Sequence, residues 1–283
     1  DMDKMFELLE HKPDVVDVAN AQELKVGPSQ IDFENVSFGY SEERGILKNI
    51  SFQVPPGKTV AIVGPSGSGK STISRLLFRF YDVDQGRITI DGQDIRDVSQ
   101  LSLRKAIGVV PQDTVLFNDT ITYNIHYGNP EAPWEQVQEA TQLAQIHGFV
   151  ESLPKGYETE VGERGLKLSG GEKQRVAIAR TILKGPRILI FDEATSALDS
   201  HTEKEIQESL REVSKERTTL VVAHRLSTII DADEILVLRQ GEIMERGRHE
   251  ELLKLGGEYS EMWKKQQKSE AQEQQTFSIE SQF

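Results

Sequence analysis

A glycine-rich segment that ends in a lysine and a serine is the part of the chain that points most directly to chemistry. Residues 64–71 read Gly-Pro-Ser-Gly-Ser-Gly-Lys-Ser and match the pattern G-x-x-x-x-G-K-[ST]. Glycines let backbone N–H groups converge on phosphate oxygens, and a helix that begins there adds the positive end of its dipole. We expect Lys70 to reach the β- and γ-phosphates of a nucleotide and the Ser71 hydroxyl to bind Mg²⁺. A flexible Gly-Ser turn is the alternative, but an apolar strand pattern precedes the segment and a helical pattern follows it.

Two adjacent acids form the second chemical feature. Asp192 and Glu193 follow the apolar run 188–191, which is typical of a strand buried on both faces. Open α/β sheets bind ligands at the carboxyl ends of their strands. Alone, such a pair is structural about as often as it is functional. Beside a phosphate loop, we interpret Asp192 as a residue that holds Mg²⁺ through water and Glu193 as the residue that polarises the attacking water.

Residues 168–175 read Leu-Ser-Gly-Gly-Glu-Lys-Gln-Arg and resemble the LSGGE-type signature of the ABC ATPases. Ser169, Gly170 and Gly171 open a predicted helix over 172–183, whose N–H groups and dipole form a second anion-binding end. The resemblance implies that this end faces the γ-phosphate held by a partner domain. The chain has one phosphate loop and one signature, so we predict a head-to-tail dimer with a second copy, formed with ATP.

Four further motifs occur in the order that the same family shows. The resemblance implies that Tyr40 stacks on adenine, that Gln112 is the glutamine of the Q-loop, that Asp199 belongs to the D-loop and that His224 is the switch histidine. A tyrosine face stacks on any purine, which predicts modest discrimination against GTP. Tyr40 alone would more often be an ordinary strand residue, and a lone histidine would more often be a partly buried residue without a catalytic role.

The predicted site is therefore an ATP and Mg²⁺ site with three groups of residues. The catalytic residues are Glu193, His224 and Gln112, and the metal ligands are Ser71, Gln112 and Asp192. The nucleotide contacts are Tyr40, Gly64, Ser66, Gly67, Ser68, Gly69, Lys70, Ser71, Thr72, Ser169, Gly170, Gly171 and Asp199.

The amino-acid composition excludes or disfavours several kinds of site and partner. The 283 residues include no cysteine, which excludes disulfides, thiolate metal sites and a catalytic thiol. The formal net charge of −13 argues against a nucleic-acid partner, which normally requires clustered Lys and Arg. No stretch approaches the roughly 20 apolar residues of a membrane span, and the first residues carry no secretory signal pattern.

The elements that must position these residues indicate an α/β fold. Residues 31–36 and 50–54 alternate with period two and predict an antiparallel sheet, whereas 59–63, 107–110, 188–191 and 219–223 read as buried parallel strands. Residues 120–171 show helical spacing, with Trp134, Val137, Ala140, Thr141 and Ala144 on one face. The predicted fold class is a P-loop NTPase (RecA-like) core with an antiparallel β subdomain and an inserted α-helical subdomain at about 120–175.

We predict three regions along the chain. Residues 1–30 read as the end of a helix and a linker from a transmembrane domain that is absent from this chain. Residues 31–265 form the ATPase domain. Residues 266–283 are rich in Glu, Gln and Ser, and their polarity predicts a disordered tail.

Longer runs favour one branch of the family. Residues 160–165 resemble the loop by which exporters contact their transmembrane domains, although alone they would read as a charged turn. Residues 75–81, 108–118 and 162–180 resemble ATM-type and heavy-metal-tolerance half-transporters of mitochondria and bacteria. That resemblance implies export of a glutathione-linked or metal-related compound. It places the ATPase on the cytoplasmic side of a bacterial inner membrane or the matrix side of the mitochondrial one.

Two other classes share the nucleotide chemistry. A soluble ABC ATPase acting on DNA or ribosomes is disfavoured by the acidic balance and by the lack of a second ATPase or a long coiled coil. A regulator that binds ATP without turnover is disfavoured because Glu193 and His224 are both present.

Overall fold

The computed structural model describes residues 14–41, 44–163, 165–193 and 200–280, and the side chains of these residues except 44, 200, 201 and 270–280. The strands are β1 (Ile31–Ser41), β2 (Arg44–Val54), β3 (Thr59–Val63), β4 (Gln85–Ile90), β5 (Gln93–Asp94), β6 (Ile107–Val110), β7 (Ile188–Asp192), β8 (Thr218–Val222), β9 (Glu234–Arg239) and β10 (Glu242–Gly247). The α-helices are α2 (Lys70–Leu77), α3 (Gln100–Ala106), α4 (Ile121–His126), α5 (Trp134–Leu143), α6 (His147–Ser152), α7 (Gly170–Lys184), α8 (Ser200–Ser214), α9 (His249–Leu255) and α10 (Glu258–Glu280), and the 3-10 helices are η1 (Gly156–Glu158) and η2 (Leu226–Ile229).

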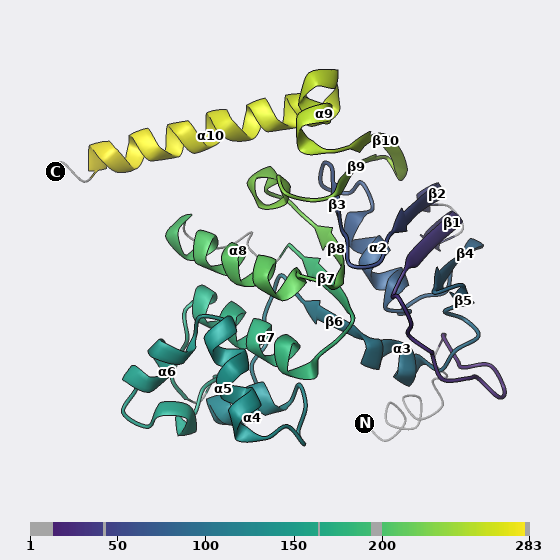
Figure 1. Ribbon diagram of the computed structural model, residues 1–283. Helices are drawn as coiled ribbons and strands as arrows, with labels where there is room; N and C mark the ends of the chain where they lie inside the picture. The colour runs from purple at the N-terminus through teal and green to yellow at the C-terminus, as the bar shows by residue number, and fades with distance from the viewer. Residues whose placement is uncertain (1–13, 42–43, 164, 194–199, 281–283) are drawn as a thin grey trace, which may run out of the picture.

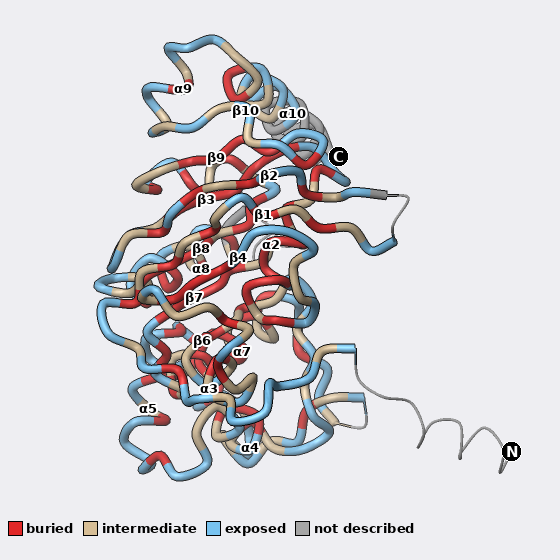
Figure 2. Tube along the Cα trace, turned by 90° about the vertical axis from the view of Figure 1, so that its right-hand side faces the viewer, coloured by how far each residue is buried: buried red, intermediate tan, exposed pale blue. Residues whose placement is uncertain are grey.

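A six-stranded sheet forms the centre of the molecule, with the order β10-β9-β3-β8-β7-β6 (Figure 1). All its neighbouring strands pair in parallel except β9 and β10. Successive residues of the parallel strands enter different cores: Val60 and Ile62 pack towards α2, whereas Ala61 and Val63 pack towards α9 and α10. Both faces of the sheet are therefore covered, which explains the continuous apolar runs. Figure 2 shows these strands as a stack of buried segments.

A second sheet, in the order β2-β1-β4-β5, is antiparallel and lies against α2 (Figure 1). Phe33 and Phe52 stack across β1 and β2 with ring centroids 4.4 Å apart and are both buried. The α/β fold class with an antiparallel sheet is confirmed. Sequence alternation identified part of β1 and β2, but it did not identify β4, β5, β9 or β10.

Helices α4, α5 and α6 form a cluster that packs on α7, and they lie within residues 120–175 (Figure 1). Val137, Ala140, Thr141 and Ala144 are buried, as the helical spacing predicted. Trp134 differs, because 39% of its surface is exposed and its ring packs on Tyr157 at 4.8 Å. Among the described residues, no helix combines the length and the apolar content that a bilayer crossing requires.

The segment before β1, which we predicted to be a linker, contacts the domain through hydrogen bonds at residues 15–17 and from residue 22 onward. Leu24 is buried, and Gln22 forms a backbone bridge with Val98. The Asp91 carboxylate accepts hydrogen bonds from the backbone N–H groups of Gly27, Ser29 and Gln30. The predicted helix over the first residues lies outside the described residues.

Arg79 joins this segment to the end of α2. It is 1% exposed and forms ion pairs with Asp17 at 3.3 Å and Asp82 at 2.9 Å. Its guanidinium also donates to the carbonyls of Val16 and Val98. One buried cation thus connects the entering chain to the helix that carries the phosphate loop.

The prediction of a disordered tail is corrected up to Glu280, because helix α10 continues to that residue. Glu, Gln, Lys and Ala, which made the tail too polar to form a core, are also among the best helix formers. The polarity of residues 266–283 argued only against a hydrophobic core. The helix needs no core there, because it continues from a buried first turn at Tyr259. Residues 281–283 lie outside the described residues.

We expect Arg79→Met to lower the free energy of unfolding by about 2–3 kcal/mol, because two carbonyls and two carboxylates lose a buried charged donor. Urea unfolding measures the change. Arg87→Met is the matched control, since Arg87 pairs with Glu34 on the surface and both side chains are largely exposed. Equal unfolding midpoints for the two variants would contradict the anchoring role of Arg79.

Candidate nucleotide-binding and catalytic site

The three predicted chemical segments leave the central sheet at the same edge. Ile62 and Asp192 are both paired with Val222 in the parallel register. The Ala223 N–H donates to the Ile62 carbonyl at 3.0 Å, and the Glu193 N–H donates to the Val222 carbonyl at 2.8 Å. The phosphate loop, the acid pair and His224 therefore start side by side at the carboxyl ends of β3, β7 and β8. This edge is where open α/β sheets bind ligands.

Close packing fixes the path of the phosphate loop. Gly64 has φ of 152°, and a Cβ there would collide with the Leu238 carbonyl oxygen of β9. Gly69 has φ of 105°, and its Cβ would lie 2.8 Å from Leu47 Cδ2 of β2. Glycine is required at both positions because the left-handed backbone and the neighbouring strands leave no room for a side chain. The loop then turns directly into α2 at Lys70.

Lys70 and Ser68 form the polar interior of this loop. The buried Lys70 Nζ donates to the carbonyls of Gly64 at 2.9 Å and Pro65 at 3.1 Å. Burial lowers the pKa of Lys70 from its ordinary value, and the charges of Glu193 and Asp192 oppose this change. The Ser68 Oγ is buried and has no hydrogen-bond partner in the structure. A buried hydroxyl without a partner is unfavourable, and a phosphate oxygen would satisfy it.

The acid pair is electrostatically strained. Burial, followed by the adjacent charge of Glu193, raises the pKa of Asp192 to about 6, while Arg75 and Lys70 partly offset the rise. Glu193 itself has a left-handed backbone with φ of 49°. Two carboxylates side by side in a partly buried position favour the approach of a cation.

The residues present fit a magnesium site of the nucleotide type. The described part of the chain contains no group of three or more His, Asp and Glu side chains arranged as a metal cage. Mg²⁺ in nucleotide sites takes one or two protein ligands and completes its shell with phosphate oxygens and water. Asp192, with its raised pKa, and Ser71, which opens α2 next to Lys70, supply the donors of such a site.

Tyr40 lies beside the phosphate-loop helix and is 46% exposed. Its hydroxyl is 3.3 Å from Thr72 Oγ1 and accepts a hydrogen bond from Arg75 at 3.1 Å. Phe38 and Tyr81 pack edge-on against its ring at 5.0 and 5.2 Å. The ring is thus held next to α2, which suits the predicted role. Sequence reasoning missed Arg75, although a cation in the helix after a phosphate loop was a signal available in the sequence.

The signature segment is exposed at Ser169 and Gly170, at the start of α7. The Ser169 hydroxyl accepts from the Glu172 N–H, and the Glu172 carboxylate accepts from the Ser169 N–H, forming a capping box. The buried Gly171 lies against Thr202, where a Cβ would collide with the Thr202 side chain. None of the hydrogen bonds found among the described residues joins this segment to the chain's own phosphate loop. The helix predicted from residue 172 begins two residues earlier.

Gln112 lies just after β6 and its side chain is exposed. The loop around it is fixed by Gln174 of α7, which sequence reasoning missed. The buried Gln174 amide accepts from the Thr114 hydroxyl at 2.8 Å and donates to the Pro111 carbonyl at 3.0 Å. A buried glutamine within the signature helix therefore connects the signature to the Gln112 loop. Its position inside the motif was the only sequence signal for this role.

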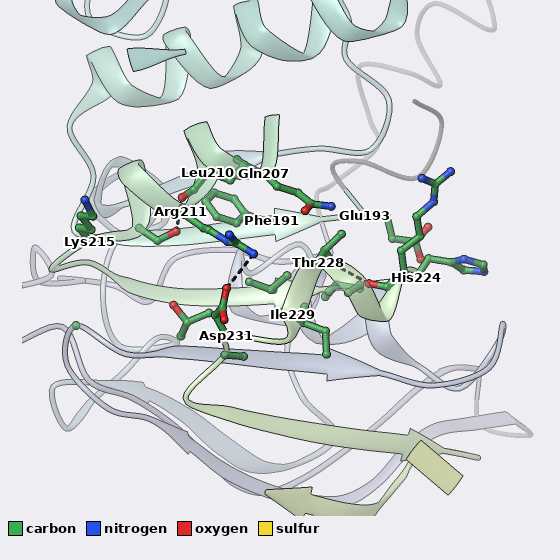
Figure 3. A pocket seen from close by; sticks show the side chains of 18 of the residues that line it. Phe191, Glu193, Gln207, Leu210, Arg211, Lys215, His224, Thr228, Ile229 and Asp231 are labelled. Atoms are coloured by element: carbon green, nitrogen blue, oxygen red, sulfur yellow. Dashed lines mark hydrogen bonds and ion pairs between the residues drawn. The ribbon is translucent and has the colours of Figure 1, made fainter. Parts of the chain in front are cut away.

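His224 is exposed and lies two residues after the end of β8. It lies at one end of a cavity of about 280 Å³ between α8, the end of β8 and η2, which Glu193 also lines. Figure 3 shows the imidazole of His224 pointing away from this cavity, and an ion pair between Arg211 and Asp231 lies between His224 and Lys215, which is drawn at the opposite end. The fully described phosphate loop contributes no lining residue. Asp199 lies outside the described residues.

Comparison with known proteins gives consistent matches. Residues 47–196 match the family described as ABC transporter. The ATP-binding cassette sub-family B member 6 of Mesocricetus auratus is 62% identical over 270 residues, which are 95% of this chain and 32% of that protein. The ATM1-type heavy metal exporter of Novosphingobium aromaticivorans is 59% identical over 266 residues, which are 94% of this chain and 44% of that protein.

A solved structure agrees with these matches. The structure of a bacterial Atm1-family ABC exporter with ATP bound superposes with a TM-score of 0.88 and 59% identity, over 94% of this chain and 46% of that one. The chain therefore spans 32% to 46% of the length of these similar proteins.

The raised pKa of Asp192 predicts a pH-dependent stability change. An acid whose pKa rises from 3.8 to about 6 on folding stabilises the fold fully below pH 3.8 and loses that contribution as the pH rises through 6. At pH 7.5 its charge is therefore destabilising. Two pKa units correspond to about 3 kcal/mol, and partial exposure reduces this to about 1–2 kcal/mol. Asp192→Asn should raise Tm by about 2–4 °C at pH 7.5 and by clearly less at pH 5.

Thermal unfolding at the two pH values, without nucleotide, measures this difference. Asp113→Asn is the control for the loss of one negative charge, because Asp113 is exposed in the Gln112 loop. A stabilisation by Asp192→Asn that is the same at both pH values, or that Asp113→Asn reproduces, would contradict the electrostatic origin.

Proposed function

We propose, from the premise that this chain belongs to the ABC transporter ATPase family, that it is the ATP-hydrolysing motor domain of a membrane exporter. The observation that carries the proposal is the convergence of Lys70, Asp192, Glu193 and His224 on the aligned carboxyl ends of β3, β7 and β8. A phosphate loop alone would support nucleotide binding. The acid pair beside it adds a group placed to act on water.

The residues of this site would bind ATP through distinct contacts. The backbone N–H groups of residues 64–71 would surround the phosphates, and Ser68 would gain the partner that its buried hydroxyl lacks. Lys70 would exchange its two carbonyl contacts for phosphate oxygens. Tyr40, held by Thr72 and Arg75, would stack on adenine.

Hydrolysis requires a cation and a positioned base. A Mg²⁺ ion held at this site would supply positive charge next to the phosphates. Asp192 and Ser71 would hold it with the help of Gln112, and the pKa of Asp192 would fall as the cation replaces its proton. Glu193 would orient and polarise the attacking water, and His224 would donate a hydrogen bond towards the γ-phosphate. The exposed position of His224 leaves its imidazole free to do so.

A second copy of the chain would complete the site. The start of α7 is exposed at Ser169 and Gly170, and the positive end of its dipole is available to an anion. It shares no hydrogen bond with the described phosphate loop of its own chain. Two chains arranged head to tail would each place this helix end, and Asp199 after it, on the nucleotide of the other.

A transmembrane domain is the other proposed partner. Four apolar side chains on and around α4 expose between 40% and 78% of their surface: Val115, Phe117, Tyr123 and Tyr127. The segment at 160–163 lies beside them, since Val161 N–H donates to the Asp119 carbonyl at 2.9 Å and Glu163 N–H donates to Asn118. Clustered exposed aromatic residues on a motor domain indicate a surface that a partner covers. Gln174 links this region to the signature helix.

The cargo and location follow from the relatives. One relative is named as a heavy metal exporter, so we propose that this motor drives export of a metal-related or glutathione-linked compound. The ATPase would lie on the cytoplasmic side of a bacterial inner membrane or the matrix side of the mitochondrial inner membrane.

We expect Glu193→Gln to lower Mg²⁺-dependent ATP hydrolysis by at least about 100-fold while ATP affinity stays within about twofold, because the amide retains size but cannot polarise water. Phosphate release and equilibrium nucleotide binding measure the two effects. Glu131→Gln, an exposed acid in the helical cluster, is the control. Hydrolysis that persists in Glu193→Gln at the wild-type rate would overturn the assigned role.

A mixing experiment tests the composite dimer. Lys70→Ala removes the phosphate contact and Ser169→Ala removes the signature hydroxyl, so each variant alone should be nearly inactive. A mixed dimer contains one site in which both are intact, and activity should rise above that of either variant to about a quarter of wild type or less. Wild-type specific activity should also rise with protein concentration. Failure of the mixture to gain activity, together with concentration-independent wild-type activity, would mean that each chain works alone.

A further inference from the structure

A glutamine on the C-terminal helix holds the backbone around His224. The Gln266 Oε1 accepts a hydrogen bond from the Leu226 N–H at 2.8 Å, and its Nε2 donates to the His224 carbonyl at 2.7 Å. The side-chain amide of Gln266 thus pairs with one backbone group on each side of Arg225, the His224 carbonyl before it and the Leu226 N–H after it. The two contacts connect residues 40 and 42 positions apart in the chain. In Figure 1, α10 runs along the top of the view, above the loop between β8 and β9 that contains this segment.

The opposite side of the same segment is held by α8. Arg225 forms an ion pair with the buried Glu203 of that helix. Residues 224–226 therefore lie between two helices, and the cavity of about 280 Å³ occupies part of the space on the α8 side. The backbone is fixed from both sides while the His224 imidazole stays exposed. A change in the position of either helix would move the imidazole.

The start of α10 is firmly attached to the central sheet. The Glu245 carboxylate of β10 accepts hydrogen bonds from the N–H groups of Glu258 at 2.6 Å and Tyr259 at 3.1 Å. Tyr259 is fully buried, and its hydroxyl is 2.7 Å from His249 Nδ1. The Trp263 ring packs on His249 at 4.7 Å. Gln266 follows this anchored turn by one more turn, so its side chain projects from a fixed point.

We infer that Gln266 is a positioning residue for hydrolysis, which sets the place of His224 by holding the His224 and Leu226 backbone. The inference rests on the proposed catalytic role of His224. The glutamine side chain ends in an amide with an acceptor oxygen and a donor N–H₂ group, which match the Leu226 N–H and the His224 carbonyl. Methionine has the same length without either function, and glutamate would direct a second oxygen against the His224 carbonyl. Helix α10 thereby becomes a route by which contacts at the C-terminal end of the chain reach the catalytic edge.

The test compares Gln266→Met and Gln266→Glu with Gln267→Met in the 283-residue chain. Gln267 is exposed on the same helix and matches the substitution in type and position. We expect kcat for Mg²⁺-ATP to fall about tenfold in both Gln266 variants with KM changed less than about twofold, because the phosphate loop and Tyr40 are untouched. A merely structural loss would instead change KM and kcat together or change neither. Wild-type kcat in Gln266→Met would overturn the inference.

Amide hydrogen exchange gives a readout that does not depend on hydrolysis. The Leu226 N–H should exchange about tenfold or more faster in Gln266→Met than in the wild type, and should be unchanged in Gln267→Met. Unchanged Leu226 exchange in Gln266→Met would overturn the inference. His224→Ala separates the two proposals: if it retains wild-type hydrolysis, the proposed role of His224 fails. If it loses activity while Gln266→Met keeps it, only the positioning role fails.

Discussion

The backbone register of β3, β7 and β8 is the constraint on which the rest of the site depends. Parallel pairing of Ile62 and Asp192 with Val222 brings three distant sequence segments to one edge. The register is stable because alternate residues of each strand enter different cores, so that a slip of one residue would exchange them. The chemistry is thus positioned by apolar packing that has no chemical role of its own.

Electrostatics then make this edge receptive to a charged ligand. Burial and the adjacent Glu193 charge raise the pKa of Asp192. The buried Lys70 amine donates to two carbonyl oxygens, and the buried Ser68 hydroxyl has no hydrogen-bond partner among the described residues. Each feature is unfavourable without a ligand, and a cation with phosphates would relieve all three. Such unfavourable arrangements are typical of functional sites, where stability is sacrificed for binding and catalysis.

Two loops at the carboxyl edge of the central sheet are held in the same way. In each, a side chain from a neighbouring helix binds the loop backbone, and the predicted functional side chain stays exposed. Gln174 of α7 holds the loop next to Gln112, and Gln266 of α10 holds the segment at His224. Arg79 fixes the entering chain to α2 in a similar way. The contacts come from separate parts of the fold, so this edge of the sheet is held by α7, by α10 and by the entering segment.

The sequence by itself determined those elements that depend only on residue types within a short segment. The phosphate loop, the acid pair, the parallel strands and the helical cluster each follow from residue types over a few positions, because periodicity and glycine placement act locally. Strands β4, β5, β9 and β10 were missed, and the tail was wrongly predicted to be disordered, since a polar segment becomes a helix when its start is anchored. Tertiary structure alone decided the contacts of Arg75, Arg79, Gln174 and Gln266. Apart from Asp82, which is three positions from Arg79, their partners lie 19 to 63 positions away in sequence. No local pattern specifies which distant carbonyl, carboxylate or hydroxyl a side chain will meet once the sheet has formed.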